Sequence, residues 1–218
     1  MKKGMIIFIS VLGIIIIGSA GFAVLYPKSP LYILAEECPP IEFPMEGGAL
    51  NITGFSGFNV SDWGEPGVTH NGIDLVVSPN NWTGILAVAD GKVRKIEESE
   101  NPYSHPPGMM MFSVYVTIAR GWELKYVIEP FAVTEQQKQL QRDNIYVVEG
   151  QEIAKNDRIA RLLCTDSGYV HLHFMLTFKS SVVCAYTYSS LAAQSIYEDI
   201  ADTYNKTICC PDAECPGC

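Results

Sequence analysis

Short apolar runs, each bounded by turn-forming residues, are the feature of this 218-residue sequence that most restricts its fold. They are rich in Val, Ile, Tyr and Phe, and Gly, Pro, Asn or Asp separates one from the next. The runs are Ile73–Val77, Ile85–Ala89, Val93–Ile96, Phe112–Ile118, Leu124–Ile128, Ile145–Val148, Ile159–Leu163, Tyr169–Phe178 and Val182–Tyr186. This spacing predicts an all-β domain built as a mostly antiparallel sheet or sandwich.

Two segments depart from the strand pattern. Residues 134–143 are strongly polar and rich in helix formers, and Thr134 suits the N-cap of a short surface helix. Residues 191–204 carry apolar side chains near helical spacing and lead into a Cys-rich tail. The sequence therefore predicts one or two short helices beside the sheet.

An uncharged run from Met5 to Tyr26 follows Lys2 and Lys3. About 20 apolar residues suffice to cross a bilayer, so the run predicts an N-terminal transmembrane helix. The lysines predict a single-pass protein of the cell membrane with its body on the extracytoplasmic side. Small residues from Ser19 to Ala23 also fit a signal peptide, in which case the protein is secreted after cleavage.

The sequence divides into four predicted parts. They are a membrane anchor or signal segment (1–28), a linker with leading strands (29–60), a β domain (61–186), and a C-terminal helix with a Cys-rich tail (187–218). The linker is Pro-rich as far as about Pro44. The chain has 24 acidic and 15 basic residues, which excludes nucleic acid as an expected partner. Nothing in the sequence indicates an oligomeric state.

Seven cysteines and several glycosylation triplets agree with export. Four triplets fit the N-glycosylation pattern, at Asn51, Asn59, Asn81 and Asn205. Exported cysteines usually form disulfides, although the tail cysteines at 209, 210, 215 and 218 are also spaced for a metal. Cys164 and Cys184 either bridge or remain two buried thiols, and Cys38 is a candidate partner for the tail.

The chemistry is concentrated in two histidine patterns, His70-Asn-Gly-Ile-Asp74 and His171-Leu-His173. Side chains alternate faces along a strand, so the members of each pattern share a face. Two such strands side by side would gather three histidines and one aspartate. Catalytic zinc commonly takes three protein ligands and leaves one position open. Gly72 would let backbone or substrate approach closely.

Each pattern taken alone is more typical of partly exposed residues than of a metal site. Their joint occurrence on strand-like segments favours metal binding. His105 lies in the turn-like stretch Tyr-Ser-His-Pro-Pro, and we expect it to be an exposed loop histidine.

The order of these motifs resembles the lysostaphin/LytM-type zinc metalloendopeptidases, which are peptidoglycan hydrolases. The matching stretches are His70 to Asp74, Ile85-Leu-Ala-Val-Ala-Asp-Gly-Lys-Val93, Val148 to Ala160 with its Gly turn, and His-Leu-His-Phe at 171–174, so the resemblance spans about 66–178. It implies a zinc ion held by His70, Asp74 and His173, with His171 as catalytic base. The implied fold is a compact antiparallel β domain with the metal in a groove.

The resemblance fails at one position. The family carries a further catalytic histidine in a Tyr-x-His segment, and the matching segment here contains Tyr126 followed by Ile128. Isoleucine donates no hydrogen bond, and loss of one such donor costs about 10²- to 10³-fold in rate. Glu129, Tyr126 and His105 are the candidate substitutes.

Two function classes follow from the resemblance. The first is a membrane-anchored zinc endopeptidase that hydrolyses peptide bonds of cell-wall or other exported substrates. The alternative is a catalytically impaired zinc-binding or regulatory module of the same fold that contacts wall polymer or partner hydrolases. A purely structural metal is a third reading, although an aspartate ligand with an adjacent histidine suits an open site better.

Overall fold

The computed structural model describes residues 35–60, 69–78, 82–102, 107–163 and 169–210. The predicted membrane-spanning run at 5–26 lies outside these ranges, as do His105 and Cys164. None of the helices in the described ranges is both long and apolar enough to span a membrane.

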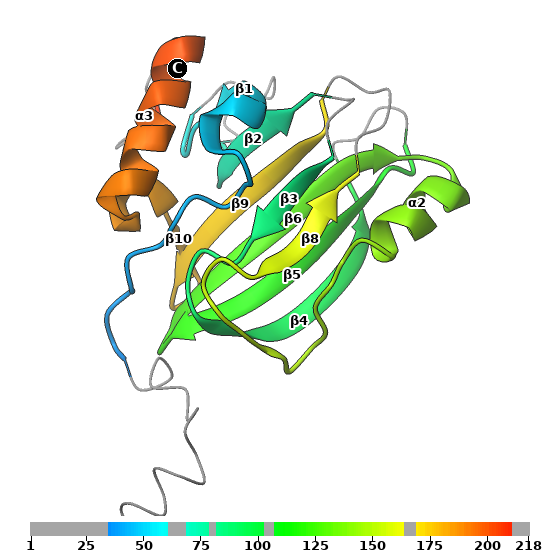
Figure 1. Ribbon diagram of the computed structural model, residues 1–218, viewed down its shortest axis with the longest axis horizontal. Helices are drawn as coiled ribbons and strands as arrows, with labels where there is room; N and C mark the ends of the chain where they lie inside the picture. Colours follow the sequence, from blue (N-terminus) through cyan, green and yellow to red (C-terminus); the bar gives the residue numbers. More distant parts are fainter. Residues whose placement is uncertain (1–34, 61–68, 79–81, 103–106, 164–168, 211–218) are drawn as a thin grey trace, which may run out of the picture. The chain divides into compact units, whose positions relative to one another are not determined.

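The largest element is an eight-stranded antiparallel sheet (Figure 1). Its strand order is β1-β2-β9-β6-β5-β4-β7, and β10 also pairs with β9. The strands are β1 (Ile52–Ser56), β2 (Ile73–Val77), β4 (Gly91–Glu100), β5 (Met110–Ala119), β6 (Trp122–Ala132), β7 (Glu152–Ile153), β9 (His171–Phe178) and β10 (Ser181–Val183). The predicted antiparallel β domain is confirmed.

One face of this sheet carries the hydrophobic core. Along β6 and β9 the fully buried side chains are every second residue, including Tyr126, Ile128, Leu172 and Phe174. A second, two-stranded sheet of β3 (Thr83–Leu86) and β8 (Arg158–Leu162) contributes to the same core. Because side chains alternate along a strand, the intervening residues of β6 and β9 face the opposite side, and that side holds the histidines.

Both predicted helices are present. Helix α2 spans Glu135–Arg142, and Thr134 and Gln137 form a reciprocal capping box at its start. Helix α3 spans Leu191–Tyr204, caps its first turn with the Ser190 hydroxyl, and packs beside β1 (Figure 1). Two 3₁₀ turns complete the described elements, η2 at Gly48–Asn51 and η3 at Ala185–Tyr188.

Three segments differ from the sequence prediction. The predicted strand Val182–Tyr186 ends at Val183, and Ala185–Tyr188 forms η3. The run Ile145–Val148 is not a strand, because only Ile145 makes a bridge, to Ala160, and Val148 is 65% exposed. At the end of the predicted linker, Ile41 and Phe43 are buried in the core. An apolar side chain every second residue lets this extended segment pack like a strand.

The cysteine pairing also differs from the candidates named from the sequence. Cys184 forms a disulfide with Cys209, with Cα atoms 6.1 Å apart, so it does not bridge to Cys164. Cys210 is disulfide-bonded as well. Cys38 is a free thiol and is not joined to the tail. The fold brings Cys184, which follows β10, beside Cys209, and sequence spacing carries no information on that contact.

Candidate metal centre

Three ligand-type side chains converge where β2 pairs with β9. The Asp74 Oδ1 atom lies 3.1 Å from His70 Nε2 and 2.7 Å from His173 Nδ1, and the two histidine nitrogens are 3.0 Å apart. Ligands at about 2.0–2.1 Å from a tetrahedral zinc ion lie about 3.3 Å from one another. Small side-chain adjustments would therefore accommodate the ion, and these residues form a group that could hold a metal.

Pairing between strands brings two of the three together. Asp74 of β2 stands directly opposite His173 of β9, so their side chains share a face. His70 precedes β2, which begins at Ile73, and the prediction that it shares a strand with Asp74 is wrong. It still reaches Asp74, because the chain turns at Gly72 before the strand starts.

Backbone contacts hold His70 in place without a strand. Its Nδ1 atom lies 2.7 Å from the Gly57 carbonyl oxygen, to which it donates a hydrogen bond. Its backbone carbonyl accepts from Asn59 N at 2.6 Å, and its N–H donates to Val60 O at 3.0 Å. With the ring proton on Nδ1, the Nε2 lone pair faces Asp74, as a metal ligand requires.

Gly72 makes room for His173. A Cβ atom built on Gly72 would lie 2.6 Å from both Cε1 and Nε2 of the His173 ring. The sequence predicts that Gly72 lets backbone or substrate approach closely. In the structure it is the side chain of His173 that lies against Gly72. A side chain at position 72 would displace the imidazole from the cluster.

His171 lies beside the three ligand residues on the same face. Its Nδ1 atom donates to the Tyr169 carbonyl at 2.7 Å, which leaves Nε2 as an acceptor facing the site. This Nε2 lies 3.8 Å from Asp74 Oδ2 and 3.6 Å from Glu129 Oε2. His171 is thus placed to receive a proton close to the candidate metal.

Ile128 does not lie in this site. It pairs with Leu172, is fully buried, and faces the core. Tyr126 faces the same way, and its hydroxyl accepts a hydrogen bond from Val88 N at 3.0 Å. The structure therefore gives no support to a catalytic histidine replaced at position 128, and Tyr126 is no substitute.

Glu129 is the β6 residue that faces His171. Its side chain is 13% exposed, and Asn101 Nδ2 donates to its Oε2 atom at 2.5 Å. The register of β6 on β9 selects it, because a shift of one residue turns a side chain to the other face. Of the three candidate substitutes, Glu129 alone has a described place in the site.

Burial and mutual charge shift the pKa values in the cluster. Burial raises the pKa of Asp74, but His171, His173 and His70 outweigh it and hold that pKa well below its usual range. Burial lowers the pKa of His171, and the Asp74 and Glu129 carboxylates more than offset this, so it lies above its ordinary value. Burial raises the pKa of Glu129. In the metal-free state, Asp74 thus carries the negative charge at the centre of the cluster.

A groove of about 370 Å³ opens onto Asp74 and His171. Its other lining residues are Phe55, Ser56, Val76, Phe131, Tyr169 and Lys206. Phe131 has a φ of 54°, in the left-handed region that a bulky residue rarely adopts, and its ring centroid lies 5.8 Å from that of His171. Such conformations persist where surrounding structure enforces them, often at functional sites.

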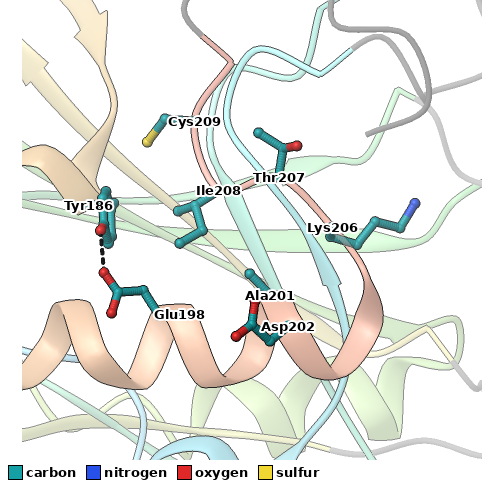
Figure 2. A pocket seen from close by; sticks show the side chains of 8 residues that line it. All are labelled: Tyr186, Glu198, Ala201, Asp202, Lys206, Thr207, Ile208 and Cys209. Carbon is teal, nitrogen blue, oxygen red and sulfur yellow. Dashed lines mark hydrogen bonds between the residues drawn. The ribbon is translucent and has the colours of Figure 1, made fainter.

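A second hollow of about 450 Å³ lies beside α3 and the segment that follows it (Figure 2). It is lined by Tyr186, Glu198, Ala201, Asp202, Lys206, Thr207, Ile208 and Cys209. The Tyr186 hydroxyl donates to Glu198 at 2.6 Å, and the Lys206 amine points away from Glu198 (Figure 2). None of these lining residues belongs to the metal cluster, but Lys206 also lines the groove beside Asp74 and His171.

No family model and no curated protein matches the chain. Several solved structures match the chain. The chain is similar in fold to lysostaphin-type peptidases. The catalytic domain of lysostaphin from Staphylococcus simulans is 19% identical with a TM-score of 0.38, over 59% of this chain and 82% of that one.

Two further structures show the same level of similarity. A mutant catalytic domain of the prophage-encoded M23 protein EnpA from Enterococcus faecalis is 17% identical with a TM-score of 0.43, over 63% of this chain and 94% of that one. A peptidase M23 from Pseudomonas aeruginosa is 18% identical with a TM-score of 0.39, over 71% of this chain. The chain spans 48% of that protein's length, less than two thirds. These similarities concern the fold, and the chemistry rests on the residues described above.

Proposed function

We propose that this protein is a zinc-dependent metalloendopeptidase that is anchored in the cell membrane and acts on the extracytoplasmic side. The observation that carries the proposal is the convergence of His70, Asp74 and His173 within 3.1 Å of one another, beside the acceptor nitrogen of His171. Three ligands of this type leave a coordination position open, as a catalytic zinc site requires.

A zinc ion in this site would polarise the scissile carbonyl and lower the pKa of water toward 7. The protein's own part is to hold the proton acceptor. His171 accepts a proton at Nε2 as water attacks the carbonyl carbon, and Tyr169 fixes the ring through Nδ1. Asp74 stabilises the imidazolium from 3.8 Å. His171 then returns the proton to the leaving amine nitrogen.

We propose exported peptides, including the peptide cross-links of cell-wall polymers, as the substrate class. The groove of about 370 Å³ beside Asp74 and His171 is lined by apolar side chains, including Phe55 and Val76, as well as polar ones, which suits a peptide segment. Membrane anchoring through residues 5–26 is proposed from the uncharged length of that run, and the secreted form remains its alternative.

The alternative is a catalytically impaired binding module of the same fold. Strand β6 carries no histidine, and the residue opposite His171 is Glu129, so the departure from the motif stands wherever the missing histidine is aligned. A module that only contacts wall polymer has no need of a base whose acceptor nitrogen faces the ligand cluster.

The test uses the full-length protein in detergent micelles. Bound zinc is measured per chain, and cleavage of isolated cell-wall material and of a panel of exported-type peptides is followed by mass spectrometry. We expect one zinc ion per chain and cleavage that is abolished by chelation. His70→Ala should lose both zinc and activity, whereas His171→Ala should keep zinc and lose activity. A protein that takes up no zinc, or cleaves equally well after chelation, would contradict the proposal.

A further inference from the structure

Glu129 and His171 stand directly opposite each other on neighbouring strands, on the face that carries the ligand cluster. The distance from Glu129 Oε2 to His171 Nε2 is 3.6 Å. This is too long for a direct hydrogen bond but short enough for one water molecule to touch both atoms. One water molecule could therefore bridge Glu129 Oε2 and His171 Nε2 next to the metal centre.

Both atoms at that position accept hydrogen bonds. His171 uses its ring proton on the Tyr169 carbonyl, so Nε2 presents a lone pair. Asn101 Nδ2 donates to Glu129 Oε2 and fixes the carboxylate's rotamer, and that oxygen keeps a second lone pair. A water molecule placed there would donate one O–H to each acceptor, and its oxygen would keep a lone pair for a metal ion held by His70, Asp74 and His173.

We propose that Glu129 is a second catalytic residue, which holds the attacking water together with His171. The proposal rests on the proposed function. As the water oxygen bonds to the carbonyl carbon, one proton passes to His171 Nε2 and the other O–H remains hydrogen-bonded to Glu129. When the C–N bond breaks, its electron pair stays on nitrogen, which takes the proton from His171.

Glu129 also accounts for the chain's departure from the motif of the family it resembles. That motif predicts a second catalytic histidine on this strand, and the residue in register with His171 is a carboxylate. A carboxylate accepts a hydrogen bond from water where a protonated imidazole would donate one to the substrate. A carboxylate at this position would therefore orient the attacking water, whereas a histidine would stabilise the substrate's oxygen.

Full-length Glu129→Gln, Glu129→His and wild-type proteins are loaded with zinc and compared on the same peptide. Glutamine keeps the size of the side chain and can still accept from Asn101, but its amide group cannot replace a charged acceptor. We expect kcat of Glu129→Gln to fall about 10²-fold or more, with KM and zinc content unchanged. Glu129→His, which retains an acceptor nitrogen, should keep a higher kcat than Glu129→Gln.

Glu123→Gln is the matched control, since Glu123 lies on the same strand and the same face but pairs with Thr177 and binds Arg94. Its kcat should equal that of the wild type. If the wild type is active and Glu129→Gln keeps its full kcat, the proposed role of Glu129 fails while the proposed function stands. Two zinc ions per wild-type chain, falling to one in Glu129→Gln, would also overturn it, because Glu129 would then be a ligand. A zinc-loaded wild type that cleaves nothing would overturn both.

Discussion

Gly72 lies against the imidazole of His173, so closely that a Cβ atom at position 72 would stand 2.6 Å from two of the ring atoms. The metal site thus requires glycine at position 72, because any side chain there would collide with His173. The contact joins the segment before β2 to β9. The two residues are 173 − 72 = 101 positions apart in the sequence.

Gly72→Ala should therefore weaken zinc binding. The added methyl group forces His173 away from His70 and Asp74, and disturbing the surroundings of a ligand typically costs about 10- to 100-fold in metal affinity. The dissociation constant can be measured by competition with a chromogenic chelator. Gly84→Ala is the control, because its methyl group would meet the flexible side-chain ends of Glu46 and Arg158, away from the cluster. Equal zinc affinity in the Gly72 variant and the wild type would contradict the steric role.

Ile128→His should destabilise the protein without raising its activity. Ile128 is fully buried opposite Leu172, and an imidazole placed there loses apolar packing and buries a polar ring. We expect a loss of about 2–5 kcal/mol in the free energy of unfolding, measured by urea denaturation. Ile128→Val, which removes one methyl group, should cost only about 0.5–1.5 kcal/mol. A faster enzyme from Ile128→His would refute the observed register of β6.

Removal of the Cys184–Cys209 disulfide should lower both stability and zinc affinity. The bridge closes a loop with a sequence separation of 25, for which loss of chain entropy in the unfolded state predicts about 3.5 kcal/mol. It also holds the segment in which Ile208 O accepts from Phe58 N at 2.8 Å, next to the Gly57 carbonyl that orients His70.

The double variant Cys184→Ala/Cys209→Ala tests both effects, by thermal unfolding and by zinc competition. Cys38→Ala is the control, since Cys38 is a free thiol. A variant with lower stability but unchanged zinc affinity would show that the tail does not support His70.

Cys38 should react slowly with alkylating reagents. Burial raises the pKa of its thiol to about 12. The thiolate is the reactive form, so at pH 8 the reactive fraction is about a thousandfold smaller than for a thiol with a pKa near 9. Iodoacetamide labelling of the Cys38 peptide, followed by mass spectrometry, should accelerate about tenfold per pH unit between pH 8 and 10. Equal labelling rates in native and urea-unfolded protein at pH 8 would disprove the burial effect.

Features that depend on neighbouring residues were predictable from the sequence alone. The N-cap at Thr134 and the full span of α3 follow from contacts three or four residues apart. The shared face of His171 and His173 follows from the two-residue period of a strand. The sequence also carried the three candidate ligands, because their spacing matched a known order of motifs.

Pairing between distant segments could only be decided by the tertiary structure. The alternation of Leu124, Tyr126 and Ile128 with charged residues already indicates that Ile128 faces the core. Only the pairing of β6 with β9 shows that Glu129 stands opposite His171. The partner of Cys184 and the occupant of the space above Gly72 likewise depend on which segments pack together. The sequence determined the residues available for catalysis, and side-chain packing around one core decided which of them meet.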